Sequence, residues 1–134
     1  MARYVIDAHT LLHIIDNALV VDRSHQLVAP NIIRSEALDL LWRDVRRGDR
    51  TERAALEAHV RLTELKMRLL GDRVSRATAW RIARENDWDT LHEAEYLAVA
   101  RLQADALVTV DPRMAARAEN VVPVLPLQAL LTGD

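Results

Sequence analysis

Short apolar runs that do not alternate with polar residues are the feature that most restricts the fold of this chain. Residues 4–6, 26–29, 106–110 and 121–125 are runs of this kind, and segments with a helical apolar period separate them. Strands that are apolar on both faces are typical of parallel sheets covered by helices. The pattern therefore predicts an α/β fold with a mostly parallel sheet.

Helices are predicted where apolar residues recur with a period of about 3.6. They cover residues 9–18, 32–48, 51–70, 75–83, 89–102 and 112–119. We expect the second and third helices to form an antiparallel hairpin across Gly48. Gly71 is expected to end the third helix as a C-cap, and Ser75 to begin the fourth as an N-cap. Pro123 predicts an edge position or a bulge for the last strand.

Asp89 or Thr90 is the predicted N-cap of the helix that runs to about Leu102, and Pro112 is expected to open the next.

The length of 134 residues predicts a single domain, residues 1–134. The chain has no cysteine, which excludes disulfides and cysteine nucleophiles. Asp7 interrupts the first apolar run too early for a signal peptide, and no apolar run approaches the roughly 18 residues of a membrane span. These features predict a cytoplasmic protein without a membrane partner.

Two strand-like runs each lead into an aspartate, Asp7 in one case and Asp111 in the other. Ligands of open α/β sheets bind beyond the carboxyl ends of the strands, so neighbouring strands would bring both carboxylates to one crevice. Each aspartate alone is explained better as a helix N-cap than as a functional residue. Glu36 and Glu93, both near the start of a predicted helix, raise the number of acids that could face this crevice to four.

Clustered carboxylates raise one another's pKa and oppose folding unless a cation neutralises them. Mg²⁺ or Mn²⁺ suits an all-oxygen set of ligands, and such ions can activate water for phosphodiester hydrolysis. The sequence therefore predicts Asp7, Glu36, Glu93 and Asp111 as metal-binding and catalytic residues.

Four sequence blocks, in order, resemble those of PIN-domain ribonucleases. They are Tyr4-Val-Ile-Asp7, Ser35-Glu36-Ala, Glu93-Ala-Glu-Tyr-Leu-Ala-Val-Ala and Leu107-Val-Thr-Val-Asp111. The blocks are spread along the sequence, so the likeness spans nearly the whole chain. The short single-domain form is similar to VapC-type toxins of toxin–antitoxin pairs. The resemblance implies a three-layer α/β/α sandwich and an endoribonuclease that cleaves RNA with Mg²⁺ or Mn²⁺ bound by the four acids. It further implies that Thr109 orders the site by hydrogen bonding, that the chain forms a homodimer, and that a small antitoxin protein covers the acidic cleft.

Two positions depart from the family pattern. The family has Asp where this chain has Glu93, so the geometry of a bound metal would shift. Asp89, one helical turn earlier, could replace Glu93 as a metal ligand, but a role as helix N-cap explains Asp89 more simply. The family has Ser, Thr or Asn where this chain has His9, whose imidazole could bind a phosphate or water or narrow the site. A catalytically lapsed PIN-like module that binds proteins is the alternative function. A receiver-like phosphoacceptor domain is poorly supported, because Lys66 is the only lysine.

Other polar and aromatic residues leave alternatives open. His9 and His13 share a helical spacing that can bind zinc, but no third ligand completes a motif, which favours ordinary histidines. Arginines between 43 and 84 either pair with neighbouring acids or line a groove for RNA phosphates. Trp42, Trp80 and Trp88 are expected to fill the core or a dimer interface.

Overall fold

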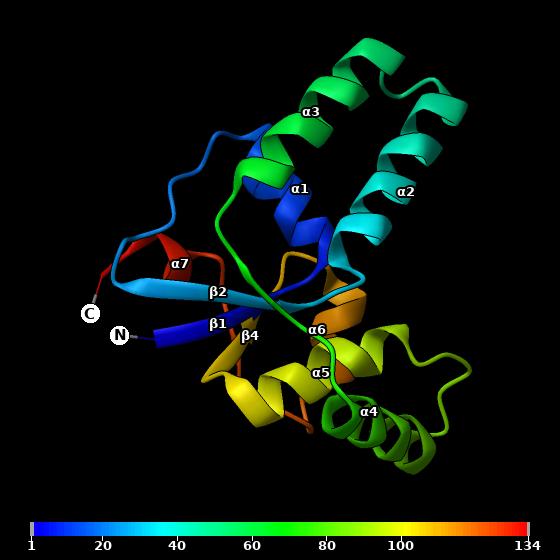
Figure 1. Cartoon of the computed structure of the whole chain (residues 1–134), viewed down its shortest axis with the longest axis vertical. Helices are drawn as coiled ribbons and strands as arrows, with labels where there is room; N and C mark the ends of the chain where they lie inside the picture. Colours follow the sequence, from blue (N-terminus) through cyan, green and yellow to red (C-terminus); the bar gives the residue numbers. More distant parts are fainter. Residues whose placement is uncertain (1, 134) are drawn as a thin grey trace.

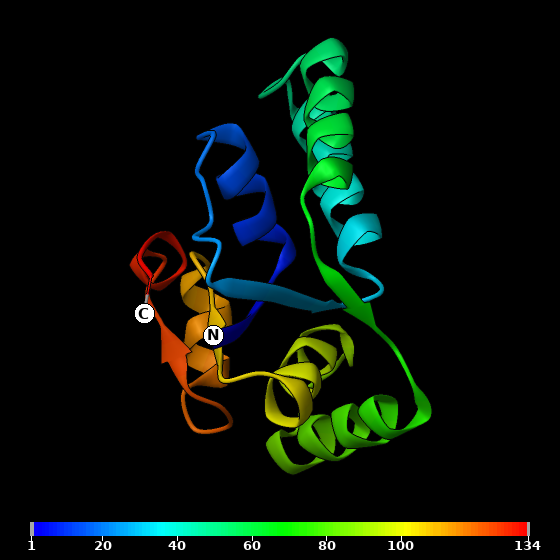
Figure 2. The ribbon, with the colours of Figure 1, turned by 60° about the vertical axis from the view of Figure 1, so that its left-hand side comes forward.

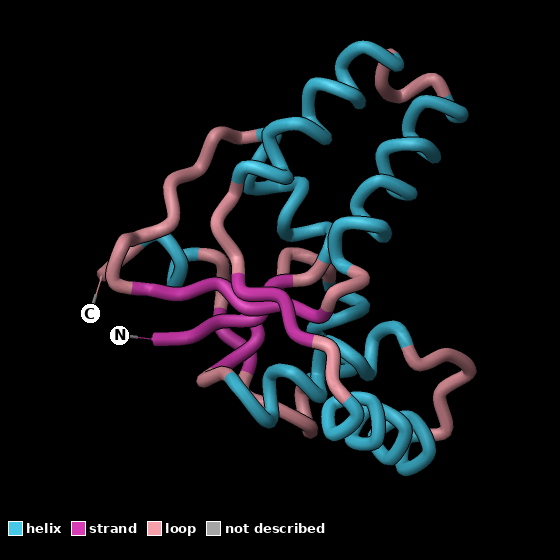
Figure 3. Tube along the Cα trace, in the orientation of Figure 1, coloured by secondary structure: helices cyan, strands magenta, loops and turns pink. Residues whose placement is uncertain are grey.

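A five-stranded sheet, parallel throughout, runs through the middle of the molecule (Figure 3). The computed structural model describes residues 2–133. The strand order is β3-β2-β1-β4-β5, with β1 (Ala2–Ile6), β2 (His25–Pro30), β3 (Arg68–Leu70), β4 (Ala106–Val108) and β5 (Val124–Leu125). All of β4 and the last three residues of β1 are buried without alternation, as the apolar runs predicted.

Helices cover both faces of this sheet and give a three-layer α/β/α sandwich, which confirms the predicted fold class. One face carries α1 (Ala8–Asp16), α2 (Ile33–Arg47) and α3 (Glu52–Glu64), and the other carries α4 (Arg73–Asn86) and α5 (His92–Gln103) (Figures 1 and 2). The chain is completed by α6 (Pro112–Ala118) and α7 (Gln128–Leu131). No helix of the described residues is long and apolar enough to cross a membrane.

The core lies between the central strands and the helices on each side. Its largest fully buried side chains come from strands and helices alike: Val5, Ile6, Leu11, Ile14, Val28, Ile33, Leu41, Leu62, Ile82, Leu97, Leu107 and Leu130. Helix α5 contacts three strands, and six of its twelve residues are buried. It is therefore a core helix, which explains why its sequence shows little separation of polar and apolar faces.

The α2–α3 pair forms the predicted antiparallel hairpin and projects from the sheet (Figure 1). Gly48 ends α2 in the left-handed conformation, with φ +80°, where a residue with a side chain would be strained. Thr51 then caps α3 by accepting a hydrogen bond from the backbone N–H of Ala54. Between them, Arg50 donates both terminal nitrogens to the carboxylate of Asp16, at 2.9 Å each, and ties the hairpin to α1.

The prediction of one helix over residues 51–70 is wrong. Helix α3 ends at Glu64, and Arg68–Leu70 pairs in parallel with the end of β2. Backbone pairing with β2 therefore overrides the local helical pattern. Gly71 is no C-cap: a Cβ at this position would overlap the side-chain amide of Asn31, so glycine permits two chain segments to approach closely.

Several element boundaries also differ from prediction. Asp72, not Ser75, caps α4; Ser75 is the third helical residue and returns the hydrogen bond in a capping box. Neither Asp89 nor Thr90 caps α5, which begins after Leu91 without a side-chain cap. The last strand is shorter than expected and starts after Pro123, at the sheet edge. Helix α7 was not predicted.

The tryptophans are less buried than expected. Trp42 on α2 and Trp80 on α4 are each 60% exposed, and only Trp88 packs against the core, half-buried. The prediction of a core role is therefore wrong for Trp42 and Trp80. Both rings are available to partners.

The Asp16–Arg50 pair predicts a pH-dependent contribution to stability. The hydrogen bonds from Arg50 lower the pKa of Asp16 below its ordinary value of 3.8. A carboxyl whose pKa is lower in the folded protein stabilises it above its unfolded pKa, and this stability is lost as pH falls through the folded pKa. We expect Asp16→Asn to lower the free energy of unfolding by about 1 kcal/mol at pH 7, and by progressively less below about pH 4. Urea unfolding of the parent and of Asp16→Asn at a series of pH values measures the difference in free energy of unfolding and its dependence on pH.

Glu57→Gln is the matched control, because Glu57 pairs with Arg53 on the exposed face of α3 at 3.5 Å. An exposed pair of this kind contributes little, so the control should change the free energy of unfolding by less than about 0.5 kcal/mol. A difference between parent and Asp16→Asn that persists undiminished at pH 2 would show that packing, not charge, carries the effect.

Candidate functional site

The strand order reverses direction between β1 and β4. The chain passes from β1 to β2 and β3 on one side, and then crosses back to place β4 on the other side of β1. Such a switch point opens a crevice at the carboxyl ends of the strands. Asp7 directly follows β1, and Asp111 follows β4 by three residues, while Ile6 and Val108 are paired in the register of the two strands. Both aspartates therefore lie at this crevice.

All four acids predicted from the sequence line one cavity of about 730 Å³ at this edge of the sheet. Asp7 comes from the end of β1, Glu36 from α2, Glu93 from α5 and Asp111 from the start of α6. The cavity lining also contains other polar and charged side chains: Tyr96, His9, His92, Ser35, Thr90, Asp39, Arg43 and Arg113. Asp89, the reserve ligand, is exposed and is not part of the lining.

Asp7 is the most buried of the four acids, with 3% of its surface exposed. One carboxylate oxygen accepts hydrogen bonds from the backbone N–H of Thr10, at 3.0 Å, and from the Thr10 hydroxyl. The other accepts from the Thr109 hydroxyl at 2.8 Å. The donors that hold this buried carboxylate are thus neutral, and Thr109 has the hydrogen-bonding position that the family resemblance implied.

The same two hydroxyls join the ends of β1 and β4. The Thr10 hydroxyl accepts from the backbone N–H of Val110 at 3.1 Å, and the Thr109 hydroxyl accepts from that of Asp111 at 3.0 Å. Each hydroxyl therefore donates to Asp7 and accepts from the segment after β4. This arrangement satisfies two partly buried backbone N–H groups and fixes the position of Asp7 relative to Asp111.

Glu36 is half-buried near the start of α2. Its Oε1 accepts a hydrogen bond from the Tyr96 hydroxyl at 2.8 Å, which links α2 to α5. Burial raises the pKa of Glu36, although the hydrogen bond from Tyr96 opposes the rise. Burial and the nearby Glu36 raise the pKa of Tyr96 as well, so this residue remains a hydrogen-bond donor.

Glu93 is neutralised by arginines of α6. Its carboxylate lies 3.0 Å from the Nη1 of Arg117 and 3.9 Å from the Nε of Arg113. The guanidinium of Arg117 also stacks over the ring of Trp88, 5.0 Å from its centroid. Glu93 therefore faces the cavity while its charge is already compensated by the protein.

Asp111 caps α6, as the N-cap explanation of its position predicted. Its Oδ1 accepts from the backbone N–H of Arg113 at 3.1 Å, and Pro112 occupies the first helical position. Its Oδ2 lies 3.9 Å from the Nε2 of His9. Capping uses one oxygen and leaves the other directed towards His9, so the capping role does not exclude a role in the cavity.

The four acids do not form a ready-made metal site. Among residues 2–133, no three His, Asp or Glu side chains are grouped closely enough to hold a metal ion as they stand. The donor chemistry of Asp7, Glu36 and Asp111 nevertheless fits a hard divalent ion, because carboxylate oxygens are its preferred ligands. Glu93 would have to break its ion pairs with Arg117 and Arg113 before it could bind such an ion.

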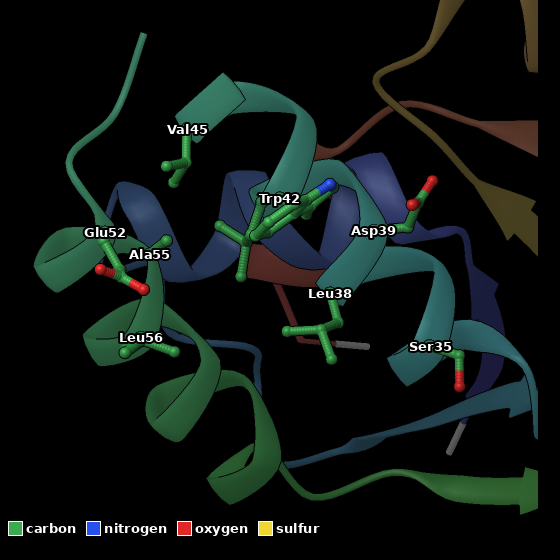
Figure 4. Close-up of a pocket in the computed structure, with 9 residues that line it drawn as sticks. Ser35, Leu38, Asp39, Trp42, Val45, Glu52, Ala55 and Leu56 are labelled. Carbon is green, nitrogen blue, oxygen red and sulfur yellow. The ribbon is translucent and has the colours of Figure 1, made fainter. Parts of the chain in front are cut away.

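A second concave surface lies between the hairpin helices. It is a groove of about 470 Å³, lined largely by apolar side chains of α2 and α3, with Leu38 and Trp42 on one helix and Ala55 and Leu56 on the other (Figure 4). Leu38, Trp42 and Leu56 are substantially exposed. Exposed apolar grooves of this kind often bind proteins. Ser35 and Asp39 line both the groove and the acidic cavity, so the two are adjacent.

Comparison with solved structures supports the fold. The chain is similar to the crystal structure of PAE2754 from Pyrobaculum aerophilum, with a TM-score of 0.77 and 23% sequence identity over 97% of this chain and 93% of that one. Identity at this level shows the fold alone. No protein-family model and no curated protein matches the sequence.

Three residues of the site were not foreseen as such from the sequence. Thr10 stands three residues after Asp7, the spacing of a donor to an N-cap, and could have been found on that ground. Tyr96 stands in the same block as Glu93, but its partner Glu36 is 60 residues away. No local signal connects Arg117 with Glu93.

The two hydroxyls predict a measurable contribution to stability. Thr10→Val removes a buried hydroxyl that donates to Asp7 and accepts from Val110, without changing the shape of the side chain much. Leaving these buried groups without a partner should lower the free energy of unfolding by about 1–3 kcal/mol in urea titrations at pH 7. Thr63→Val is the control, because the Thr63 hydroxyl donates only to a carbonyl on exposed α3; it should change stability by less than about 0.5 kcal/mol. Equal effects of the two substitutions would contradict this role of Thr10.

Proposed function

We propose that this chain is a divalent-metal-dependent endoribonuclease of the PIN-domain kind that acts as the VapC-like toxin of a toxin–antitoxin pair. The observation that carries the proposal is the convergence of Asp7, Glu36, Glu93 and Asp111 on one cavity at the switch point of the sheet. These residues come from four separate segments of the chain. Acids gathered in a cavity at this place in an α/β sheet are typical of an active site.

Mg²⁺ or Mn²⁺ is the proposed cofactor, held by Asp7, Glu36 and Asp111, with Glu93 as a further ligand only if it separates from Arg117. When bound, such an ion supplies activated water and stabilises the leaving oxygen in phosphodiester hydrolysis. All-carboxylate ligands and the lack of any cysteine agree with a hard ion.

The chain's own residues would hold the carboxylate ligands in fixed positions and place cationic side chains beside them. Thr10 and Thr109 hold both oxygens of Asp7 in fixed directions, and Tyr96 holds one oxygen of Glu36. Arg43 and Arg113 line the same cavity, where Arg43 pairs with Asp39 and Arg113 lies 3.9 Å from Glu93. Their guanidinium groups would reach the phosphate oxygens of an RNA strand by exchanging these acids for phosphate. Fixed ligands and nearby cations are the arrangement that phosphodiester cleavage needs.

A cognate antitoxin, homodimer formation and a cytoplasmic location belong to the same proposal. The apolar hairpin groove supports a protein partner, because its exposed leucines and Trp42 would be buried by one. Its border with the acidic cavity at Ser35 and Asp39 would let such a partner cover the site as well.

Substitution of single acids tests the catalytic assignment. Asp7→Asn or Asp111→Asn should lower the rate of RNA cleavage by at least about 100-fold, because a neutral amide is a poor ligand for a hard cation. Cleavage of a panel of structured RNAs in Mn²⁺, followed by gel electrophoresis, measures the rate. Circular dichroism spectra should match that of the parent.

Asp89→Asn is the matched control, since Asp89 is exposed and outside the cavity lining. It should cut RNA at the parent rate. If Asp89→Asn abolishes cleavage while Asp7→Asn does not, the assignment of ligands is wrong.

A second candidate function is a catalytically lapsed module that binds proteins through the hairpin groove. The observation that favours it is the pairing of Glu93 with Arg117 and Arg113, which already compensates one of the four acids. In that case the remaining acids would have no need of a metal.

Calorimetric titration with Mn²⁺ separates the two functions. The nuclease should bind Mn²⁺ saturably with a dissociation constant in about the millimolar range or tighter, and Asp7→Asn should weaken binding by about 10-fold or more. Heats of dilution alone, identical for parent and variant, would decide for the lapsed module.

A further inference from the structure

One face of α4 carries a row of cations around an exposed aromatic ring. Arg73, Arg76, Trp80 and Arg84 follow one another at spacings of three or four residues and so lie on one side of the helix, with Arg81 beside them. All five side chains are exposed, whereas Thr78, Ala79, Ile82 and Ala83 on the opposite side are buried. We call these five residues the arginine face. It spans about 16 Å from Arg73 to Arg84.

The arginines of α4 differ from those of the hairpin in their partners. Arg43, Arg47, Arg50 and Arg53 each form an ion pair with an aspartate or glutamate. Within residues 2–133, by contrast, no arginine of the arginine face is ion-paired, and only Arg81 hydrogen bonds to another side chain, that of Thr78. The hairpin also carries Arg46 and Arg61, which form no ion pair within the described residues, so paired and unpaired arginines occur together there. On the arginine face, all four arginines lack an ion pair in the same part of the chain.

Four acids lie near the arginine face: Asp72, Glu85, Asp87 and Glu95, of which Glu95 lines a small cavity together with Arg76 but is not ion-paired with it in the described residues. Asp72 uses its carboxylate to cap α4. Glu85 and Asp87 lie at the far end of the helix, and neither forms an ion pair in the described part of the chain. Four guanidinium groups on one helix face thus retain their charge, which suits a polyanion.

Trp80 indicates which polyanion fits. Its ring is 60% exposed in the middle of the arginine face. A base that is free of a duplex can stack on such a ring, and the neighbouring arginines can bind the phosphates on either side. A symmetric contact between two copies of this face would bring eight arginines together, so charge disfavours a second copy of the chain.

The arginine face is connected to the acidic cavity along the chain. Helix α4 leads through residues 87–91 into α5 (Figures 1 and 2). Thr90 of this connection and Glu93 of α5 both line the cavity. The end of α4 that carries Arg84 is therefore joined to the cavity lining by a connection of five residues.

We propose that the arginine face of α4 binds single-stranded RNA, with the arginines on its phosphates and Trp80 on a base, and so holds the substrate strand beside the acidic cavity. The proposal rests on the proposed function for the identity of the polyanion. It assigns RNA binding to a surface that is separate from the four acids.

Binding without cleavage tests this surface. The probe is a fluorescein-labelled single-stranded RNA of about twelve nucleotides, titrated with the full chain in EDTA and followed by fluorescence anisotropy. The triple variant Arg73→Gln/Arg76→Gln/Arg84→Gln should bind at least about tenfold more weakly. The slope of log affinity against log salt should fall in magnitude by about two, since three phosphate contacts are lost. Trp80→Ala should weaken binding by about tenfold.

Matched variants elsewhere control for net charge and for the loss of a ring. Arg46→Gln/Arg53→Gln/Arg61→Gln removes the same charge from the hairpin, and Trp42→Ala removes a ring with the same 60% exposure. Both should bind RNA as the parent does. Thermal unfolding of every variant should match that of the parent, because all substituted side chains are exposed.

The outcomes separate this proposal from the nuclease proposal. If the parent binds RNA in EDTA through α4 but cuts none in Mn²⁺, the surface stands and the proposed function fails. If the parent cuts RNA and the α4 triple variant binds it as tightly as the parent, the surface is wrong and the function stands. If the hairpin and α4 triple variants lose equal RNA affinity, the assignment of RNA binding to α4 is wrong. If Trp80→Ala changes the molecular mass measured by light scattering but leaves RNA affinity unchanged, the partner of this surface is a second copy of the chain and the RNA proposal is wrong.

Discussion

The hydrogen bonds of Asp7 with Thr10 and Thr109 hold together the two strands on which the rest of the site depends. A carboxylate that is 3% exposed would oppose folding if it lost water without gaining donors. Two hydroxyls and one backbone N–H replace that water, and the same hydroxyls accept backbone N–H groups from the segment after β4. Because β1 and β4 flank the point where strand order reverses, this small network defines the floor of the acidic cavity.

The four acids are stabilised in four different ways. Asp7 has neutral hydroxyl and backbone donors, Glu36 has a tyrosine, Glu93 has two arginines and Asp111 has the backbone of α6. Sequence reasoning held that such a group of like charges requires a bound cation. The structure provides each acid with a partner of its own. Asp7 and Glu36, whose donors are neutral, are the acids whose chemistry best fits a metal.

The sheet was predictable from the sequence because its central strands are buried on both faces and read as continuous apolar runs. Asp7 and Asp111 could be placed at one edge for the same reason, since parallel strands end together. Strand β3 was missed because residues after Glu64 continue a helical pattern, and only pairing with β2 makes them extended. Arg117 was missed because its contact with Glu93 joins two helices and leaves no periodic signal. Of the two positions expected for Trp80, the core is wrong, because its ring lies on the exposed side of α4, and a dimer interface stays a prediction.

The position of Arg117 has a consequence for anything that enters the cavity. Its guanidinium is held by Glu93 on one side and by the ring of Trp88 on the other. A metal ion that binds Glu93 must therefore displace the guanidinium of Arg117 from the Glu93 carboxylate. Binding of the ion would then be an exchange of one cation for another. An arginine released in this way remains next to Arg113, free to meet an incoming anion. Loading with a cation and capture of a negatively charged strand would then be mechanically linked through a single side chain.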